Sequence, residues 1–405
     1  MRVLLFCSNF PHSHKDAIVS GVVKNAFNHA LSLAQNDIKV SVITDGRQSG
    51  KWECNGINVV CVGPGFSRGV VRACMLDILM TIHFLRNKNL YDVVHIHTGN
   101  LLLFFALKKL RVFKIPVVYT AHGTTTPELG ANFDTKKSFY ERLVRLNGIV
   151  QEIIDRFMWK NSDLLISVSD FQLKEMKTIY RVSDDRIRTV RNGVDRNLYF
   201  PDKISATSLR ESLCINEEHP VVVFVGRLVR KKGVHLLINS IEEVLSAHQD
   251  VRFVVVGGDM KRGFDSEYVK QLKEMSEPYV KAKKMFIIEN VSEEELPAYY
   301  NMADVCVFPS LEYESLPTVI YEAMACGKPI ITQGSWGTPE VLDDVLLSER
   351  QLLDGKLGSE ISMLLEDTDR QAALSAINLN TVTQYCWKEI GKEYKHIYEK
   401  LIAHT

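Results

Sequence analysis

Residues 304–332, DVCVFPSLEYESLPTVIYEAMACGKPIIT, decide the fold of this 405-residue chain. They predict a buried strand at Val305–Phe308, a helix from Pro317 to Ala325 that is closed by Gly327, and a second buried strand at Pro329–Thr332. A Pro-Ser turn and an acidic loop connect the first strand to the helix. A strand, a helix and a second strand in this order form the crossover unit of a parallel α/β sheet.

Two carboxylates in this stretch have a spacing that suits a shared ligand site. Glu314 lies in the loop, and Glu322 follows eight positions later inside the helix, a little over two helical turns away. Open α/β sheets bind ligands at the carboxyl ends of their strands, where this loop lies. A solvated helix face is the alternative for two isolated acids. However, Glu322 stands among Ile320, Ala323 and Met324, which leaves little exposed surface.

The sequence ESLPTVIYEAMACGKPII, with the Pro-Ser turn before it, resembles the Glu-(any seven)-Glu signature of the family-4 retaining glycosyltransferases (group 1). Both acids, the Pro, the Glu-Ala-Met-Ala run and the Gly-(any)-Pro keep the register of that signature. The resemblance covers nearly the whole chain and is sharpest from 221 to 340. It implies the GT-B fold: two Rossmann-like α/β domains that face each other across a cleft, with a C-terminal helix packing back on the first domain.

Short apolar strands alternate with amphipathic helices along both halves of the chain, a pattern that predicts two parallel sheets. The polar segment 197–219 separates the two series. We therefore expect an N-terminal acceptor-binding domain at 1–197, a nucleotide-sugar-binding domain at 198–383, and a returning helix at 384–405. The predicted strands are Val3–Cys7, Lys39–Thr44, Val59–Val62, Val93–His97, Val117–Ala121, Leu164–Val168, Ile187–Val190, Val221–Gly226, Phe253–Gly257 and Met285–Glu289, besides the two above, and the first-half helices are 21–35, 69–87, 101–112, 136–161 and 170–180.

The composition describes a globular chain whose two halves carry opposite charge. The chain is 46% hydrophobic and 24% charged, which leaves room for two sizeable cores. Its formal net charge of +0 disfavours a nucleic-acid partner. Residues 1–200 nevertheless contain 27 Lys and Arg against 17 Asp and Glu, a balance of +10, and the remainder balances at −10. The basic half predicts an anionic partner.

The short apolar runs and the spacing of the cysteines predict a cytoplasmic protein. The first apolar run ends at Cys7, and the longest, Leu101–Leu107, is too short to span a bilayer. The eight cysteines show no CxxC spacing and are expected to be reduced core thiols.

Three apolar and basic segments of the first half, 68–88, 101–114 and 136–160, predict peripheral contact with anionic lipid at the inner face of the membrane. Ordinary core-facing helices are the alternative for each segment alone. In the second segment, Lys108, Lys109, Arg111 and Lys114 are the basic residues expected to meet the lipid.

The strand end VVVFVGRLVRKKG offers a diphosphate site. Arg227 and Lys232 follow the strand, and a diphosphate requires fixed positive charge in such a place. A solvated basic loop is the alternative. The residues also resemble the family's Gly-Arg-Leu…Lys-Gly motif, which implies that Arg227 and Lys232 hold the donor diphosphate. Since they supply the positive charge, we expect no metal and no cofactor, and the one Asp-x-Asp triplet, Asp367–Asp369, lies far from any strand end.

The glycines of the first strand-helix turn do not match a dinucleotide fingerprint. A long loop after Cys7 contains only Gly21 before the helix, whereas NAD binding requires a G-x-G-x-x-G pattern. Gly21 still suits a phosphate at a helix start, with an ordinary turn glycine as the alternative. Family members carry a Gly-Gly loop there, of which this chain keeps only the second Gly.

Three histidines lie at the ends of predicted strands of the first half. His95 and His97 share one strand face, but no cysteine or carboxylate spacing completes a metal site, and we expect none. His122 precedes Gly123 at a strand's carboxyl end. A capped core imidazole is the alternative. The resemblance implies that His122 contacts the transferred sugar.

The resemblance implies a retaining hexosyltransferase that moves sugar from a nucleotide diphosphate, which we expect to be a UDP-sugar, to a glycan or lipid-linked hydroxyl in cell-surface polysaccharide or glycoconjugate synthesis. The alternatives are an epimerase or hydrolase of the same fold and a non-catalytic nucleotide-sugar-binding subunit. Glu289 replaces the usual Gly near the nucleobase. The implied catalytic residues are Arg227, Lys232, Glu314 and His122, and the donor-binding set is Gly21, Gly226, Arg227, Lys232, Gly257, Glu289, Val291, Glu314, Ser315, Leu316, Pro317, Thr318 and Glu322.

Overall fold

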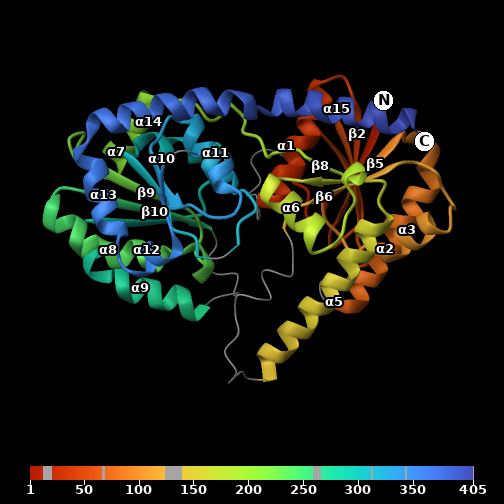
Figure 1. Cartoon of the computed structure of the whole chain (residues 1–405), viewed down its shortest axis with the longest axis horizontal. Helices are drawn as coiled ribbons and strands as arrows, with labels where there is room; N and C mark the ends of the chain where they lie inside the picture. The colour runs from red at the N-terminus through yellow and green to blue at the C-terminus, as the bar shows by residue number, and fades with distance from the viewer. Residues whose placement is uncertain are drawn as a thin grey trace. The chain divides into compact units, whose positions relative to one another are not determined.

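The computed structural model divides the chain into two compact units (Figure 1). It describes residues 1–11, 21–65, 69–123, 139–258, 266–311, 313–342 and 344–404, and the side chains of residues 139–147, 258 and 266 are not described. The N-terminal unit contains the described residues up to Gly193 together with the C-terminal helix from Trp387 onward. The C-terminal unit contains Val194–Cys386. The unit boundaries therefore lie at 193/194 and 386/387, whereas the sequence analysis places them at 197/198 and 383/384.

The N-terminal unit is built on a sheet with the order β3-β4-β2-β1-β5-β6-β7-β8, in which all described pairs are parallel except β3 with β4. Strand order reverses between β1 and β5, because β2 lies on one side of β1 and β5 on the other. The strands are β1 (Arg2–Phe6), β2 (Lys39–Asp45), β3 (Gly50–Cys54), β4 (Ile57–Val62), β5 (Val93–Ile96), β6 (Val117–Ala121), β7 (Leu164–Ser167) and β8 (Ile187–Thr189).

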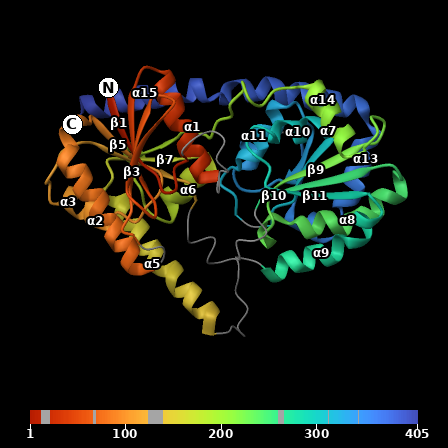
Figure 2. The same ribbon diagram turned by 180° about the vertical axis from the view of Figure 1, so that it is seen from behind.

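Side chains alternate along β1 and divide the N-terminal unit into two cores. Val3 and Leu5 pack with the apolar residues of α1 and α15 on one face of the sheet. Leu4 and Phe6 pack on the other face with residues of α2, α3, α5 and α6. Figures 1 and 2 show α1 and α15 side by side. The C-terminal helix therefore packs on the first unit, as predicted. The helices are α1 (Gly21–Gln35), α2 (Val70–Asn87), α3 (Leu102–Lys109), α5 (Phe139–Asn161), α6 (Asp170–Thr178) and α15 (Trp387–Ala403).

The C-terminal unit contains a parallel sheet with the order β11-β10-β9-β12-β13-β14. This is the doubly wound Rossmann order, which reverses between β9 and β12. The first strand of the unit thus lies beside the fourth. The strands are β9 (Val221–Arg227), β10 (Arg252–Gly258), β11 (Met285–Glu289), β12 (Val305–Phe308), β13 (Ile330–Gln333) and β14 (Val345–Leu347).

Helices cover both faces of this second sheet, which confirms the predicted pair of Rossmann-like α/β units. One core contains residues of α7, α10 and α11, and the other contains residues of α8, α9, α12 and α13. The helices are α7 (Lys203–Ser212), α8 (Val234–Ala247), α9 (Ser266–Lys281), α10 (Leu296–Met302), α11 (Thr318–Ala325), α12 (Glu349–Leu353), α13 (Leu357–Glu366) and α14 (Thr368–Thr381), with short 3₁₀ turns at Lys88–Leu90, Asp184–Arg186, Arg230–Lys232, Thr338–Glu340 and Val382–Tyr385.

The structure differs from the predicted elements at three places. The prediction missed β3, because this largely exposed edge strand has no apolar alternation, and it missed β14, because its apolar run has only three residues. The helix predicted at 101–112 ends at Lys109. It ends there because Arg111 takes a left-handed backbone with φ 59°, which an α-helix does not continue through.

The exposure of the cysteines and the apolar length of the helices can be compared with the sequence predictions. All eight cysteines are free, but Cys74 and Cys214 are exposed, so the prediction of core thiols is wrong for these two. Cys74 lies on an exposed part of α2, and Cys214 lies in the turn that follows α7. Among the helices within the described ranges, none is long and apolar enough to cross a membrane.

Candidate donor-binding site

The candidate site of the C-terminal unit lies where the strand order reverses. β9 and β12 are neighbours, but β9 continues toward β10 on one side and β12 toward β13 on the other. The loops that follow these two strands diverge, and doubly wound sheets bind ligands in the resulting crevice. Arg227 is the last residue of β9, Lys232 lies in the turn after it, and Glu314 follows β12.

A close backbone contact holds the two loops together. The Leu311 amide donates a hydrogen bond to the Lys231 carbonyl oxygen at 2.8 Å. Gly233 has φ 70°, and a Cβ atom built there would lie 1.9 Å from the Pro309 carbonyl oxygen. Glycine is therefore required at 233 both for its left-handed backbone and for this close approach. This contact fixes where α8 begins and where Lys232 lies.

Lys232 and Glu314 form an ion pair between the two loops. Both side chains are largely buried, with exposed fractions of 17% and 16%. Arg227, at the end of β9, is exposed. These two loops thus offer one partly desolvated ammonium group, one accessible guanidinium group and one carboxylate. Positive groups of this kind suit a diphosphate, and a carboxylate accepts hydrogen bonds from hydroxyl groups.

Glu322 is buried inside α11, with an exposed fraction of 2%, so the solvated-face alternative is wrong for this residue. The Tyr300 hydroxyl donates a hydrogen bond to Glu322 Oε2 at 2.7 Å. Burial, with the neighbouring Glu322 carboxylate, raises the pKa of Tyr300 well above its ordinary value. Tyr300 is therefore a neutral donor that orients the carboxylate. The sequence analysis missed Tyr300, because a tyrosine in the apolar run of α10 has no distinguishing signal.

The predicted residues between the two acids form the start of α11. Ser315 and Leu316 are buried, and the Ser315 hydroxyl donates to the Tyr313 hydroxyl at 3.1 Å. Pro317 takes the N-cap position, and Thr318 is the first helical residue. The backbone N–H groups at this helix start face the same loop as Glu314, because the loop leads directly into the helix.

Three other predicted residues align across neighbouring strands at their carboxyl ends. Gly257 of β10 is in register with Gly226 of β9 on one side and with Glu289 of β11 on the other. A Cβ atom at Gly257 would lie 2.5 Å from Leu228 Cγ, so the position requires glycine. Glu289 and Val291 are half-buried. The row from Gly226 to Glu289 therefore runs along the carboxyl ends of three neighbouring strands to the edge strand β11.

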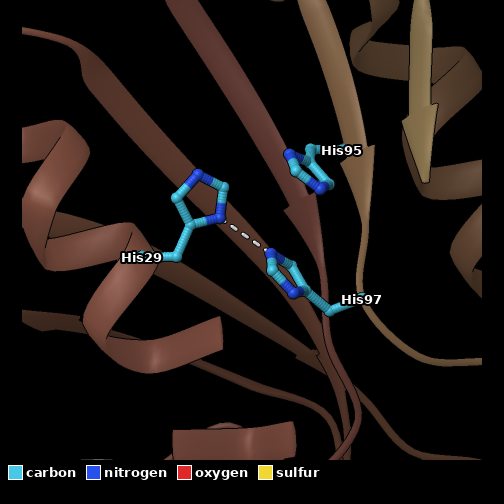
Figure 3. Close-up of side chains that lie close together, drawn as sticks. All are labelled: His29, His95 and His97. Atoms are coloured by element: carbon cyan, nitrogen blue, oxygen red, sulfur yellow. Dashed lines mark hydrogen bonds between the residues drawn. The ribbon is translucent and has the colours of Figure 1, made fainter. Parts of the chain in front are cut away.

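Gly21 and His122 belong to the N-terminal unit. Gly21 begins α1 and is exposed, and among the described residues no atom lies within 4 Å of the position of a Cβ. His122 follows β6, and its Nε2 atom lies 3.0 Å from His97 Nδ1. Burial lowers the pKa of His122 to about 4, which keeps the ring neutral at pH 7. The alternative of a capped imidazole is thus partly correct, because the His122 ring has a hydrogen-bond contact with His97. His97 in turn contacts His29 beside His95 (Figure 3).

Two family models match successive parts of this chain. The model described as Glycosyltransferase Family 4 matches residues 19–198, and the model described as Glycosyl transferases group 1 matches residues 205–375. The chain belongs to the group 1 glycosyltransferases of family 4, and it is a glycosyltransferase of the GT-B type.

Relatives along the whole length agree with this assignment. An uncharacterised glycosyltransferase of Methanocaldococcus jannaschii is 25% identical over 94% of this chain and 95% of its own. A sucrose-phosphate synthase of Thermosynechococcus elongatus has a similar fold, with a TM-score of 0.80, 20% identity and complete coverage of both chains. The Anabaena protein HepE, solved with UDP and glucose, has a TM-score of 0.72 and 19% identity, covering 99% of this chain and 100% of HepE.

Proposed function

We propose that this glycosyltransferase moves a hexose from a UDP-sugar to a hydroxyl group with retention of the anomeric configuration. The observation that carries the proposal is the Lys232–Glu314 ion pair at the strand-order reversal. Arg227 ends the strand that leads to Lys232. The similar fold of HepE, which was solved with UDP and glucose, supports a uridine donor.

The chemistry of donor cleavage explains why these residue types are needed. When the diphosphate leaves, the sugar becomes oxocarbenium-like and the β-phosphate gains negative charge. Arg227 and Lys232 would stabilise that charge, which is the largest catalytic contribution expected of the protein. Glu314 would bind sugar hydroxyls, and Glu322 the ribose hydroxyls. The departing phosphate takes the proton of the acceptor hydroxyl on the same face, so no separate general base is required.

A donor panel tests the nucleotide. We expect UDP-sugars to raise the melting temperature more than GDP- or ADP-sugars do, because at equal concentration the ligand with the lower Kd stabilises the folded state more. Tighter binding of GDP-mannose than of every UDP-sugar would overturn the uridine assignment. Donor turnover that needs no acceptor would instead indicate a hydrolase or epimerase, and donor binding without turnover would indicate a non-catalytic subunit.

We further propose that the reaction needs no metal. Asp367, the first acid of the Asp-x-Asp triplet, accepts a hydrogen bond from the Arg370 amide at 2.8 Å and caps α14. This triplet therefore has a structural explanation. Activity should survive EDTA, and complete loss that Mn²⁺ restores would count against the metal-free reaction.

The acceptor is proposed to be lipid-linked, at a membrane surface. α2 exposes Val70, Val71 and Ile78, and the neighbouring turn after α3 exposes Leu110. Lys109, Arg111 and Lys114 are exposed at and after the end of α3, where Lys88, just after α2, donates to the Val112 carbonyl oxygen. Exposed apolar and basic side chains on these elements suit anionic lipid headgroups.

The structure corrects one residue of the expected lipid contact. Lys108 pairs with Asp163 at 2.6 Å and donates to the Ile115 carbonyl oxygen at 3.2 Å, so it supports the fold. Flotation with anionic and neutral liposomes at low salt tests the surface. We expect binding to anionic vesicles only, and its loss when Lys109, Arg111 and Lys114 are all changed to Glu. Equal, negligible flotation with both vesicles would indicate a soluble acceptor.

A further inference from the structure

The loop that follows β13, residues 334–337, is fixed at both of its ends, and we call it the β13 loop. At its start, the Gly334 amide donates a hydrogen bond to the Leu347 carbonyl oxygen of β14 at 2.8 Å. At its end, the Glu340 amide donates to the Gly337 carbonyl oxygen at 3.1 Å and closes a 3₁₀ turn. The sheet of the C-terminal unit and this turn therefore place the middle of the loop.

The β13 loop contacts the segment that carries Glu314. The Gly337 amide donates a long hydrogen bond, of 3.5 Å, to the Glu314 carbonyl oxygen. The ring of Trp336 lies beside the ring of Tyr313, with centroids 6.3 Å apart and planes at 57°, which is a favourable arrangement for two aromatic rings. Tyr313 is itself buried and accepts a hydrogen bond from the Ser315 hydroxyl at 3.1 Å. One main-chain bond and one ring contact thus join the loop to Glu314 and to the residue before it.

Trp336 has a left-handed backbone, with φ 60°. Glycine adopts this conformation without steric cost, whereas a bulky residue there is an outlier. Non-glycine residues in this region persist only where the surrounding structure over-determines them, and they cluster at functional sites. Burial alone does not account for the tryptophan, because the residue is only partly buried. The ring contact with Tyr313 is what a glycine at this position would lose.

We propose that Trp336 is a positioning residue for Glu314. Its indole holds Tyr313, and with it the main chain of the next residue, so that the Glu314 carboxylate stays where it meets the hydroxyl groups of the donor sugar. The sugar part of this proposal rests on the proposed function, whereas the packing of Trp336 against the Glu314 segment does not. All of these residues belong to the C-terminal unit. The β13 loop thereby becomes a third loop of the donor site, after those that follow β9 and β12.

The main chain of Glu314 needs support from outside its own segment. Glu314 lies between the end of β12 and the start of α11, so neither element holds it directly. Its carboxylate pairs with Lys232, and a shift of the Glu314 main chain would disturb that ion pair. A displacement of about 1 Å in a binding group can cost about 10²-fold in rate. A residue that fixes this segment therefore controls the geometry of the ion pair as well.

Direct contact with the sugar is the competing interpretation of Trp336. Aromatic side chains line small-molecule sites together with a few polar groups, and the partly exposed indole could itself pack against the donor. The two interpretations differ in how Trp336 depends on Glu314. A ring that contacts the sugar by itself acts with or without the Glu314 carboxylate, whereas a positioning ring acts only through it.

Hydrogen–deuterium exchange of the full chain without substrate tests the positioning directly. Trp336→Gly removes the indole, and glycine adopts the left-handed backbone freely, so the turn itself is preserved. We expect the amides of residues 313–318 to exchange faster in this variant, while those of β10 exchange as in the wild type. Trp336→Phe keeps a ring beside Tyr313 and should restore most of the protection. Unchanged exchange of 313–318 in Trp336→Gly would overturn the proposal, and so would faster exchange throughout the unit, because it would show a general loss of stability.

A double-mutant cycle separates positioning from direct contact. We expect Trp336→Gly to lower kcat/KM for the donor roughly 10- to 100-fold, mainly through kcat, because Glu314 is misplaced. In a Glu314→Gln background, the same change should have little further effect. Ser335→Ala is the matched control, since it shortens the neighbouring side chain of the same loop and keeps the indole. It should leave both the exchange and the kinetics unchanged.

The outcomes separate this proposal from the proposed function. Additive effects of the two changes on kcat/KM would show that the indole acts independently of Glu314, which overturns the positioning role. Faster exchange of 313–318 with unchanged kinetics would overturn the sugar part alone. Because exchange is recorded without substrate, it remains decisive even if the donor panel excludes UDP-sugars, and the cycle is then measured with the nucleotide sugar that the panel identifies.

Discussion

Replacing Lys232 by Ala should cost this enzyme most of its activity while leaving it folded. The Lys232 side chain is only 17% exposed, so solvent screens its charge less than a surface charge. A unit charge about 4 Å from the developing phosphate charge contributes about 4 kcal/mol at an effective dielectric constant of about 20. Loss of one such group typically lowers kcat by about 10²- to 10³-fold, which corresponds to about 2.7–4 kcal/mol. We expect a loss of that size in kcat/KM.

The assay compares steady-state transfer from the donor sugar with the melting temperature of each variant. Lys231→Ala is the matched control, since it removes the same charge one residue earlier and keeps the backbone carbonyl that accepts from Leu311. A double-mutant cycle with Glu314→Gln should be non-additive, because the two side chains are in contact. Kinetics within about threefold of the wild type at a normal melting temperature, or additive effects in the cycle, would refute the role assigned to Lys232.

Three further predictions follow from the buried contacts. Tyr300→Phe removes the donor to the Glu322 carboxylate and should lower the free energy of unfolding in urea by about 1.5–3 kcal/mol. Gly233→Ala should destabilise the protein by more than about 1 kcal/mol, because the new Cβ meets the Pro309 carbonyl and φ is positive; unchanged urea midpoints in either variant would contradict these contacts. Stability should also fall on acidification, because burial lowers the pKa of four imidazoles in the N-terminal unit. The pKa of His29 falls from 6.5 to about 3 and that of His122 to about 4, and the pKa values of His95 and His97 also fall well below 6.5. The contribution of these neutral imidazoles to the free energy of unfolding is then fully present above pH 6.5 and is lost as the pH falls toward 3. Urea unfolding at a series of pH values measures it. A free energy of unfolding that stays constant from pH 7 to 4 would contradict it.

The fold follows from local sequence patterns to a large extent. The crossover of β12, α11 and β13 lies within one or two residues of its predicted bounds, because uninterrupted apolar runs and Gly327 define buried strands and a helix end locally. The same pattern predicted that Glu322 is buried. Edge strand β3 escaped prediction, since an exposed edge imposes no apolar period on its residues.

What only the tertiary structure decided is which residues meet. Lys232 and Glu314 contact each other because β9 lies next to β12, and strand order is not encoded in the period of either strand. Tyr398 reaches His29 because the last helix packs on the first, 369 residues earlier in the chain. In the sequence, Lys108 has the pattern of a surface lysine, and only the tertiary structure brings Asp163 into contact with it. Local periodicity records burial and element type, whereas a site assembled from distant segments depends on the packing of the whole sheet and its helices.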